Sequence, residues 1–181
     1  LEGALRLAGV DPHGRLCLDV GQSTGGFTDC LLQQGARRVV GVDVGHGQLH
    51  PRLRGDPRVA CFEGLNARAL TAMDLGADAG PFELLVGDLS FISLTLVLPA
   101  LVPLLAPGGE LLMLVKPQFE LQPGQVGKGG IVRDAALYPV VEQRLRQACQ
   151  ALGLRVLAWH DSVIAGGDGN REFFIHARQG D

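Results

Sequence analysis

One stretch near the start of the chain constrains the fold more than any other. Residues 16–20 form a short apolar run that predicts a buried strand, and a glycine-rich turn and an apolar run at helical spacing follow it. A strand, a tight glycine turn and a helix form the ligand-binding corner of doubly wound α/β sheets. Glycine lets a ligand approach the backbone closely, because it has no Cβ atom. We therefore expect a ligand site at the carboxyl end of this strand, beside Asp19.

The turn differs from the dinucleotide-binding fingerprint. That fingerprint is G-x-G-x-x-G, whereas here Gly21 is separated from the Gly25-Gly26 pair by polar residues. An acidic residue before such a turn suits a cationic or hydroxyl-rich ligand better than a pyrophosphate. A strand-to-helix turn without any ligand remains the alternative at this point of the argument.

The rest of the chain alternates between predicted strands and helices. This alternation is typical of an α/β fold with a mostly parallel sheet, and the last two strands predict a hairpin at its edge. The helix at 93–105 is expected to bend or restart at Pro99. A chain of 181 residues without an internal repeat fits one domain. The predicted strands are 16–20, 38–43, 58–63, 82–88, 109–116, 154–160 and 171–177, and the predicted helices are 1–8, 27–34, 48–53, 66–75, 93–105 and 139–152.

Composition narrows the class of protein. A hydrophobic share of 46% and a charged share of 19% predict a globular core and exclude disorder. The net charge of −3 argues against a self-sufficient nucleic-acid surface. The 4 cysteines are widely spaced without a C-x-x-C pair, which is typical of free thiols in a reducing compartment. The same spacing argues against a metal site. With no signal peptide in view, we expect a cytoplasmic protein.

The longest apolar run, residues 84–106, approaches the length of a membrane span. It carries Asp88, Ser90 and Ser93, and a charged residue within a bilayer is costly. The run therefore predicts a buried strand, a polar turn and a core helix, and we expect no stable membrane association.

Charged residues recur where the predicted strands end. Asp19, Asp43 and Asp88 come at the carboxyl ends of their strands, Lys116 ends the next one, and Glu172 enters from the last hairpin. In a parallel sheet these ends meet at one edge. A lysine between carboxylates can orient or deprotonate a hydroxyl when burial lowers its pKa. A structural ion pair at the sheet edge is the alternative interpretation.

Six blocks, taken in order along the chain, form a recognisable set: 19–27, 43–45, 88–93, 115–120, 126–130 and 169–173. In these blocks the chain resembles the TlyA group, whose members are often labelled hemolysins (hemolysin A-like). That group is similar to FtsJ-like S-adenosylmethionine-dependent ribose 2′-O-methyltransferases acting on ribosomal RNA. The resemblance covers essentially the whole chain, and the ordered set of blocks is more specific than any one of them.

The resemblance implies a Rossmann-like, seven-stranded methyltransferase sheet and a catalytic Lys-Asp-Lys-Glu tetrad. Asp88, Lys116 and Glu172 match its last three members. Lys116 is expected to polarise or remove the proton of a ribose 2′-hydroxyl, with Asp88 and Glu172 holding it in place. The first lysine belongs to a block that should end at Leu1, and the group carries an N-terminal RNA-binding domain. We therefore expect residues 1–181 to be a single methyltransferase domain, a fragment without that domain that methylates RNA poorly by itself.

The resemblance also implies S-adenosylmethionine as the cofactor and ribosomal RNA or ribosomal subunits as partners. The cofactor's amino-acid end is expected over residues 21–27, its ribose hydroxyls on Asp43 and its adenine near Asn66. The long glycine-rich loop 117–133 is expected to be functional. The expected cofactor residues are Asp19, Gly21, Ser23, Thr24, Gly25, Gly26, Phe27, Asp43, Val44, Asn66 and Asp88, and the expected RNA-binding residues are Lys128, Arg133 and Arg171.

Two other functions remain open from the sequence. A membrane-lytic hemolysin would need an amphipathic or spanning segment, for which only residues 84–106 could serve. A catalytically lapsed cofactor-binding module that binds ribosomes or another partner is the other alternative. The intact set of Asp88, Lys116 and Glu172 argues against such a lapse.

Overall fold

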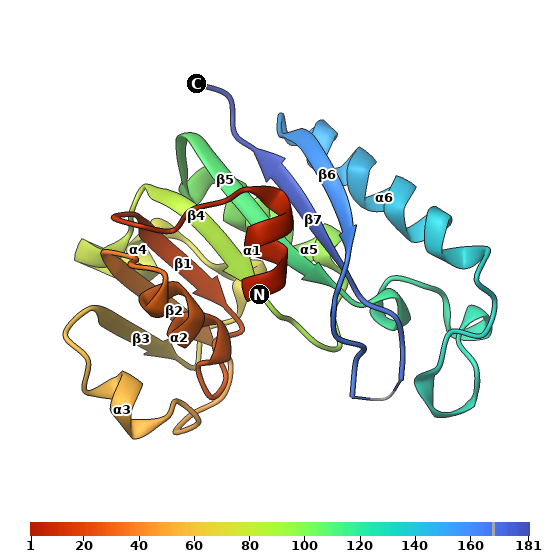
Figure 1. Cartoon of the computed structure of the whole chain (residues 1–181), viewed down its shortest axis with the longest axis horizontal. Coiled ribbons are helices and arrows are strands. Elements are labelled where there is room, and N and C mark those ends of the chain that lie inside the picture. The colour runs from red at the N-terminus through yellow and green to blue at the C-terminus, as the bar shows by residue number, and fades with distance from the viewer. Residues whose placement is uncertain (168) are drawn as a thin grey trace.

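The structure, a computed structural model, describes residues 1–167 and 169–181. Within them the strands form one sheet with helices on both faces, as Figure 1 shows. The strands are β1 (Leu16–Val20), β2 (Arg38–Asp43), β3 (Val59–Glu63), β4 (Phe82–Gly87), β5 (Leu105–Val115), β6 (Arg155–Asp161) and β7 (Phe173–Arg178). The helices are α1 (Glu2–Ala8), α2 (Gly26–Gln33), α3 (Pro51–Arg54), α4 (Ala72–Leu75), α5 (Leu94–Leu101) and α6 (Leu137–Ala151).

The sheet has the order β3-β2-β1-β4-β5-β7-β6 and 7 strands among the described residues. β3, β2, β1, β4 and β5 are parallel, and β7 inserts antiparallel between β5 and β6. The prediction of a mostly parallel sheet with an antiparallel C-terminal hairpin is therefore confirmed. The strand order reverses between β1 and β4, and such a switch point is where open α/β sheets bind ligands.

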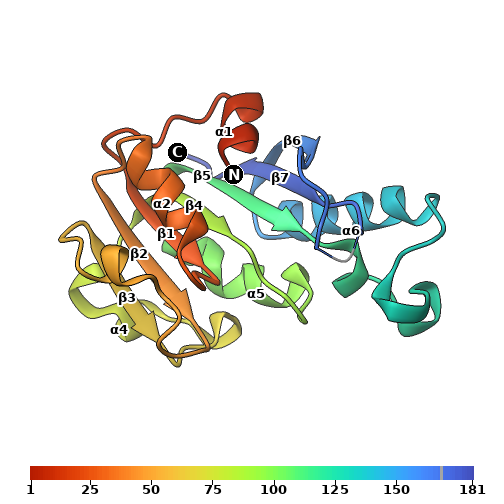
Figure 2. The same ribbon diagram turned by 60° about the horizontal axis from the view of Figure 1, so that its bottom comes forward.

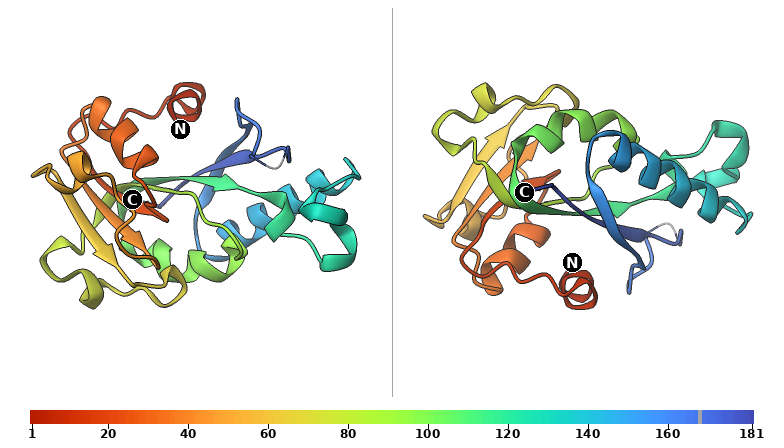
Figure 3. Two further views of the ribbon diagram at one scale, coloured as in Figure 1. Left: turned by 90° about the horizontal axis from the view of Figure 1, so that it is seen from below. Right: turned by 90° about the horizontal axis from the view of Figure 1, so that it is seen from above.

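Two apolar cores cover the two faces of the sheet. Leu18 and Val20 of β1 belong to the core under α5 and α6, whereas Cys17 belongs to the core under α1 and α2. This is the alternation expected of successive residues along a strand. Figures 2 and 3 show the sheet from further sides, with α1 and α2 on one face and α5 and α6 on the other. Burial of both faces fixes the register of the strands, and with it the position of every strand end.

Three predicted helices differ from the structure. Residues 66–75 form a 3₁₀ turn and the short α4, because the Asn66 side chain accepts from Arg68 N–H at the first and Asp74 accepts from Thr71 N–H at the second. The helix predicted at 48–53 begins at Pro51, a residue favoured at the first helical position. α5 continues through the exposed Pro99 and changes to a 3₁₀ turn only at Val102–Leu104.

The long apolar run is divided as the sequence predicts. It supplies β4, the polar loop after it and then α5, which packs in the core. Across residues 1–167 and 169–181, no helix combines the length and apolar character that crossing a bilayer requires.

Candidate functional site

A pocket of about 250 Å³ opens at the carboxyl ends of β1, β2 and β4. It lies at the switch point of the sheet, where the glycine turn after β1 approaches the loop after β4. Its walls combine aliphatic side chains with two carboxylates, a lining that suits a ligand with an aromatic base and hydroxyl or cationic groups. The lining residues are Val20, Gly21, Ser23, Val42, Asp43, Val44, Gln48, Leu65, Ala67, Asp88, Leu89, Ser90 and Phe91.

The glycine turn is held close to its neighbours. A Cβ atom on Gly21 would lie 2.2 Å from the backbone oxygen of Asp88, so only glycine fits at this position. Ser23 follows in the left-handed region with φ of 52°, and its N–H donates to Asp43 Oδ2 at 2.7 Å. Gly45 N–H donates to Asp43 Oδ1 at 2.8 Å. Asp43 therefore fixes both turns that border the pocket.

Asp19 lies beneath the turn and does not line the pocket. Its side chain is buried, with 1% of the residue exposed, and Thr28 Oγ1 donates to its Oδ2 at 2.7 Å. Gln22 Nε2 donates in turn to Thr28 Oγ1 at 2.9 Å. Among the described residues, Asp19 Oδ1 has no hydrogen-bond partner. Burial raises the pKa of Asp19 to about 7, and the hydrogen bond from Thr28 opposes this shift.

Lys116 and Asp88 form an ion pair at the mouth of the pocket. Lys116 Nζ lies 2.5 Å from Asp88 Oδ1 and donates to Ser90 Oγ at 3.0 Å. The Lys116 side chain is 16% exposed and that of Asp88 is 38% exposed. Val115 is paired with Phe173, so Lys116 and Glu172 are the next residues along this antiparallel register. The structure therefore brings Asp88 and Lys116 together and places Glu172 directly before β7, the strand that pairs with β5.

The remaining predicted cofactor residues divide into two groups. Gly21, Ser23, Asp43, Val44 and Asp88 line the pocket. The others lie around it: Thr24 before α2, Gly25 against Leu49 and Leu53, Gly26 at the start of α2, Phe27 stacked on Phe174, and Asn66 as a cap. Asn66 is nevertheless flanked by Leu65 and Ala67, which do line the pocket. The cofactor roles of all these residues stay predictions.

The predicted RNA-binding residues lie on the loop after β5 and on the last hairpin. Lys128 and Arg133 are exposed on the loop 117–133, which projects at the right of Figure 1. The buried Asn170 clamps this loop, since Val132 N–H donates to its Oδ1 at 2.9 Å and its Nδ2 donates to the Gly130 carbonyl at 2.8 Å. The Arg171 guanidinium lies 4.9 Å from the ring centre of Tyr138 and pairs with Asp161. The RNA-binding role of these three cations stays a prediction.

Sequence reasoning missed the residues that complete the pocket. Phe91 is 89% exposed, adopts φ of 65° and lines the pocket rim. Phe91 belongs to the block 88–93 of the family resemblance, but a sequence does not show that an aromatic side chain is exposed. Gln48, Leu89 and Ser90 also line the pocket. The signal for Leu89 and Ser90 was their place directly after a strand-end acid.

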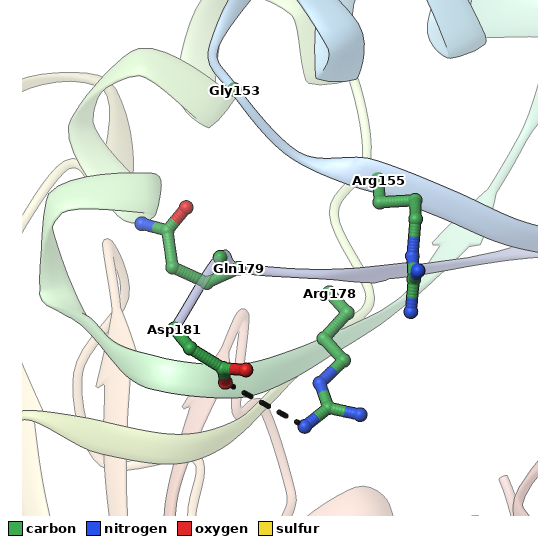
Figure 4. Close-up of a pocket in the computed structure, with 6 residues that line it drawn as sticks. Gly153, Arg155, Arg178, Gln179 and Asp181 are labelled. Carbon is green, nitrogen blue, oxygen red and sulfur yellow. Dashed lines mark ion pairs between the residues drawn. The ribbon is translucent and has the colours of Figure 1, made fainter.

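Other features of the molecule are separate from this site. A cavity of about 260 Å³ lies at the opposite end of the sheet, between Arg155, Arg178 and Asp181 (Figure 4). It contains none of the predicted functional residues. His50 caps α3 with its Nδ1. In the residues that the structure describes, no group of three or more His, Cys, Asp and Glu side chains is placed to hold a metal ion.

Comparison with known proteins gives one consistent family. Residues 1–179 match the model of the FtsJ-like methyltransferases. The chain is 47% identical over 178 residues to the 16S/23S rRNA (cytidine-2′-O)-methyltransferase TlyA of Mycobacterium tuberculosis, covering 98% of this chain and 65% of that protein. It therefore spans about two thirds of that relative's length.

Solved structures agree with this family. A protein described as a hemolysin from Streptococcus thermophilus superimposes with a TM-score of 0.94 at 40% identity, covering 99% of this chain and 64% of that one. An S-adenosylmethionine-dependent methyltransferase from Mesorhizobium loti superimposes with a TM-score of 0.70 at 15% identity, covering 98% of this chain and 96% of that one. At that identity the second likeness concerns the fold alone.

Proposed function

Because the chain belongs to the FtsJ-like methyltransferase family, we propose that it transfers a methyl group from S-adenosylmethionine to a ribose 2′-hydroxyl of ribosomal RNA. The observation that carries the proposal is Lys116, which is held between Asp88 and Ser90 at the mouth of the switch-point pocket. The name of the mycobacterial relative supports ribosomal RNA, and cytidine within it, as the substrate. With ribosomal RNA as the substrate, we infer that the reaction takes place in the cytoplasm.

The chemistry of the pocket lining supports S-adenosylmethionine as the cofactor. Gly21 lets the turn pack directly against the Asp88 backbone, where a Cβ atom would collide, and Asp43 and Asp88 offer acceptors for hydroxyl and ammonium groups. Val42, Val44, Leu65 and Ala67 provide apolar surface for an adenine. When bound, S-adenosylmethionine supplies an electrophilic methyl group on a sulfonium sulfur. Ser23, Asp43 and Asp88 are the residues that we assign to hold it.

The chain's own groups act on the nucleophile. The Lys116 ammonium donates a hydrogen bond to the ribose 2′-oxygen and stabilises the negative charge that develops there as the hydroxyl proton passes to solvent water. Asp88 fixes the ammonium at 2.5 Å, and Glu172 directly precedes the adjacent strand β7. Holding the oxygen in line with the electrophile is the larger contribution, because orientation alone can supply about 7–11 kcal/mol of a barrier.

Substitution of Lys116 tests this assignment. In the intact protein, Lys116→Ala should abolish tritiated-methyl incorporation into ribosomal subunits and leave the affinity for S-adenosylhomocysteine within about threefold, since Lys116 acts on the nucleophile. Arg58→Ala is the matched control, because Arg58 forms an exposed ion pair with Asp56 beside β3. Near-normal turnover by Lys116→Ala would refute the mechanism.

The same preparations separate the other two functions. Dye release from liposomes would support the membrane-lytic alternative. Tight binding to ribosomal subunits without methyl incorporation by the wild type would support the catalytically lapsed module. Mapping of the modified nucleotide identifies the target in the ribosomal RNA.

A further inference from the structure

Glu120 lies outside the pocket, and the catalytic assignments do not use it. We propose that Glu120 is a positioning residue, which locks the turn carrying Lys116 to the loop carrying Asp88. The inference rests on the proposed function, since it concerns the geometry of the Lys116–Asp88 pair during methyl transfer.

Lys116 and Glu120 belong to the same tight turn after β5. Phe119 N–H donates to the Lys116 carbonyl at 3.0 Å, and Glu120 N–H donates to the Pro117 carbonyl at 2.9 Å. The Arg144 guanidinium of α6 donates to the Glu120 carbonyl from the other side. The backbone between Lys116 and Glu120 is therefore fixed. A displacement of the Glu120 side chain would displace Lys116 as well.

The Glu120 carboxylate reaches across to the other loop. Ser93 Oγ donates to its Oε2 at 2.5 Å, and Leu94 N–H donates to its Oε1 at 2.8 Å. Ser93 and Leu94 end the loop that begins with Asp88. Glu120 is buried, with 4% of the residue exposed; burial raises its pKa, and the two hydrogen bonds oppose that shift. A buried carboxylate with two donors is a strong and directional link.

This link is more than a helix cap. α5 already has its own cap, because Thr95 N–H donates to Ser93 Oγ at 3.2 Å. Glu120 gives the start of α5 two further acceptors from a segment that is distant in sequence. That segment also carries Lys116. The loops touch again at the outer side, through Lys116–Ser90 at 3.0 Å and the Phe91–Phe119 rings at 5.1 Å. The two loops are thus joined at two places, and Glu120 forms the buried one. Together these contacts set the position of Lys116 relative to Asp88.

The test compares three variants of the intact protein. Glu120→Ala removes the link, whereas Glu120→Gln keeps an oxygen for Leu94 N–H and an N–H for Ser93 Oγ. Glu110→Ala is the matched control for lost stability. Glu110 is a partly buried carboxylate held by Arg15 at 2.9 Å and His176 at 2.6 Å, near the opposite end of the sheet.

The measurements are kcat and KM for ribosomal subunits, calorimetric affinity for S-adenosylhomocysteine, and hydrogen exchange of residues 88–94. Rates are compared per folded molecule. We expect Glu120→Ala to lower kcat about 100-fold, the scale of an ångström-sized misplacement, with KM and cofactor affinity within about threefold. Exchange at residues 88–94 should accelerate. Glu120→Gln should restore kcat to within about threefold, and Glu110→Ala should leave kcat unchanged.

Three results would overturn the inference. They are wild-type kcat in Glu120→Ala, failure of Glu120→Gln to restore kcat, and an equal loss of kcat in Glu110→Ala. Failure of the proposed function gives a different result, because the wild type itself would then transfer no methyl group. In that case the exchange data still decide whether Glu120 holds the Asp88 loop.

Discussion

Replacement of Asp19 by asparagine should remove one component of the pH dependence of stability. The Asp19 carboxyl is buried against α2, and burial raises its pKa from the ordinary value of 3.8 to about 7. The folded protein therefore binds this proton more tightly than the unfolded chain. Stability from this group is fully present below pH 3.8 and is lost as the pH rises through about 7.

The size of the effect follows from the shift. Each pKa unit corresponds to about 1.4 kcal/mol. Between about pH 5 and about pH 8 the wild type should lose about 3 kcal/mol of its free energy of unfolding through Asp19, because roughly two units of the shift lie in that interval. Asp19→Asn has no such proton to lose. The difference in stability between variant and wild type should therefore change by about 3 kcal/mol across this range.

Urea unfolding at a series of pH values measures this difference without cofactor. Comparison of two proteins at each pH cancels the contributions of other groups, including Glu120, whose pKa is also raised by burial. Thr28→Val gives a second test, because it removes the hydrogen bond that lowers the pKa of Asp19. The pKa of Asp19 should then rise further, and the pH-dependent decrease in the free energy of unfolding should extend to higher pH than in the wild type. Parallel stability curves for wild type and Asp19→Asn would refute the reasoning.

Three further substitutions address the pocket, its rim and the loop. Asp43→Ala should weaken S-adenosylhomocysteine binding by about 1–3 kcal/mol in calorimetry, the scale of lost hydrogen bonds to a charged group; equal affinity would exclude Asp43 from the site. Phe91→Ala should leave the free energy of unfolding within about 0.5 kcal/mol of the wild type, because the ring is exposed. The same variant should reduce methyl incorporation into ribosomal subunits about tenfold. Met73 is similarly exposed, and Met73→Ala should not reduce incorporation. Asn170→Ala should cost about 1–3 kcal/mol in urea unfolding and accelerate hydrogen exchange of residues 126–133; unchanged exchange would contradict the clamp.

Much of the site could be predicted because strand ends are local features. The apolar runs before Asp88 and Lys116 define β4 and β5, and these two strands are adjacent in the sheet. A parallel sheet then brings their carboxyl ends to one edge, so the ion pair follows from the topology. Glu120 could not be found in this way. Its partners are Ser93 and Leu94, and only the tertiary structure brings the start of α5 within reach of the turn after β5.

The three strand-end acids Asp19, Asp43 and Asp88 do not all line the pocket, and their positions along the strands explain why. Asp43 is the last residue of β2, and Asp88 is the first residue after β4. Both line the pocket, whereas Asp19 is the residue before the last in β1 and is covered. Side chains alternate along a strand, so Asp19 faces α2 and meets Thr28 while its neighbours face α5. A difference of one residue in the distance from the strand end thus separates an acid that can contact a ligand from an acid that supports the turn from beneath. A strand-end acid can therefore be assigned to a ligand only when both its distance from the strand end and the face it occupies are known.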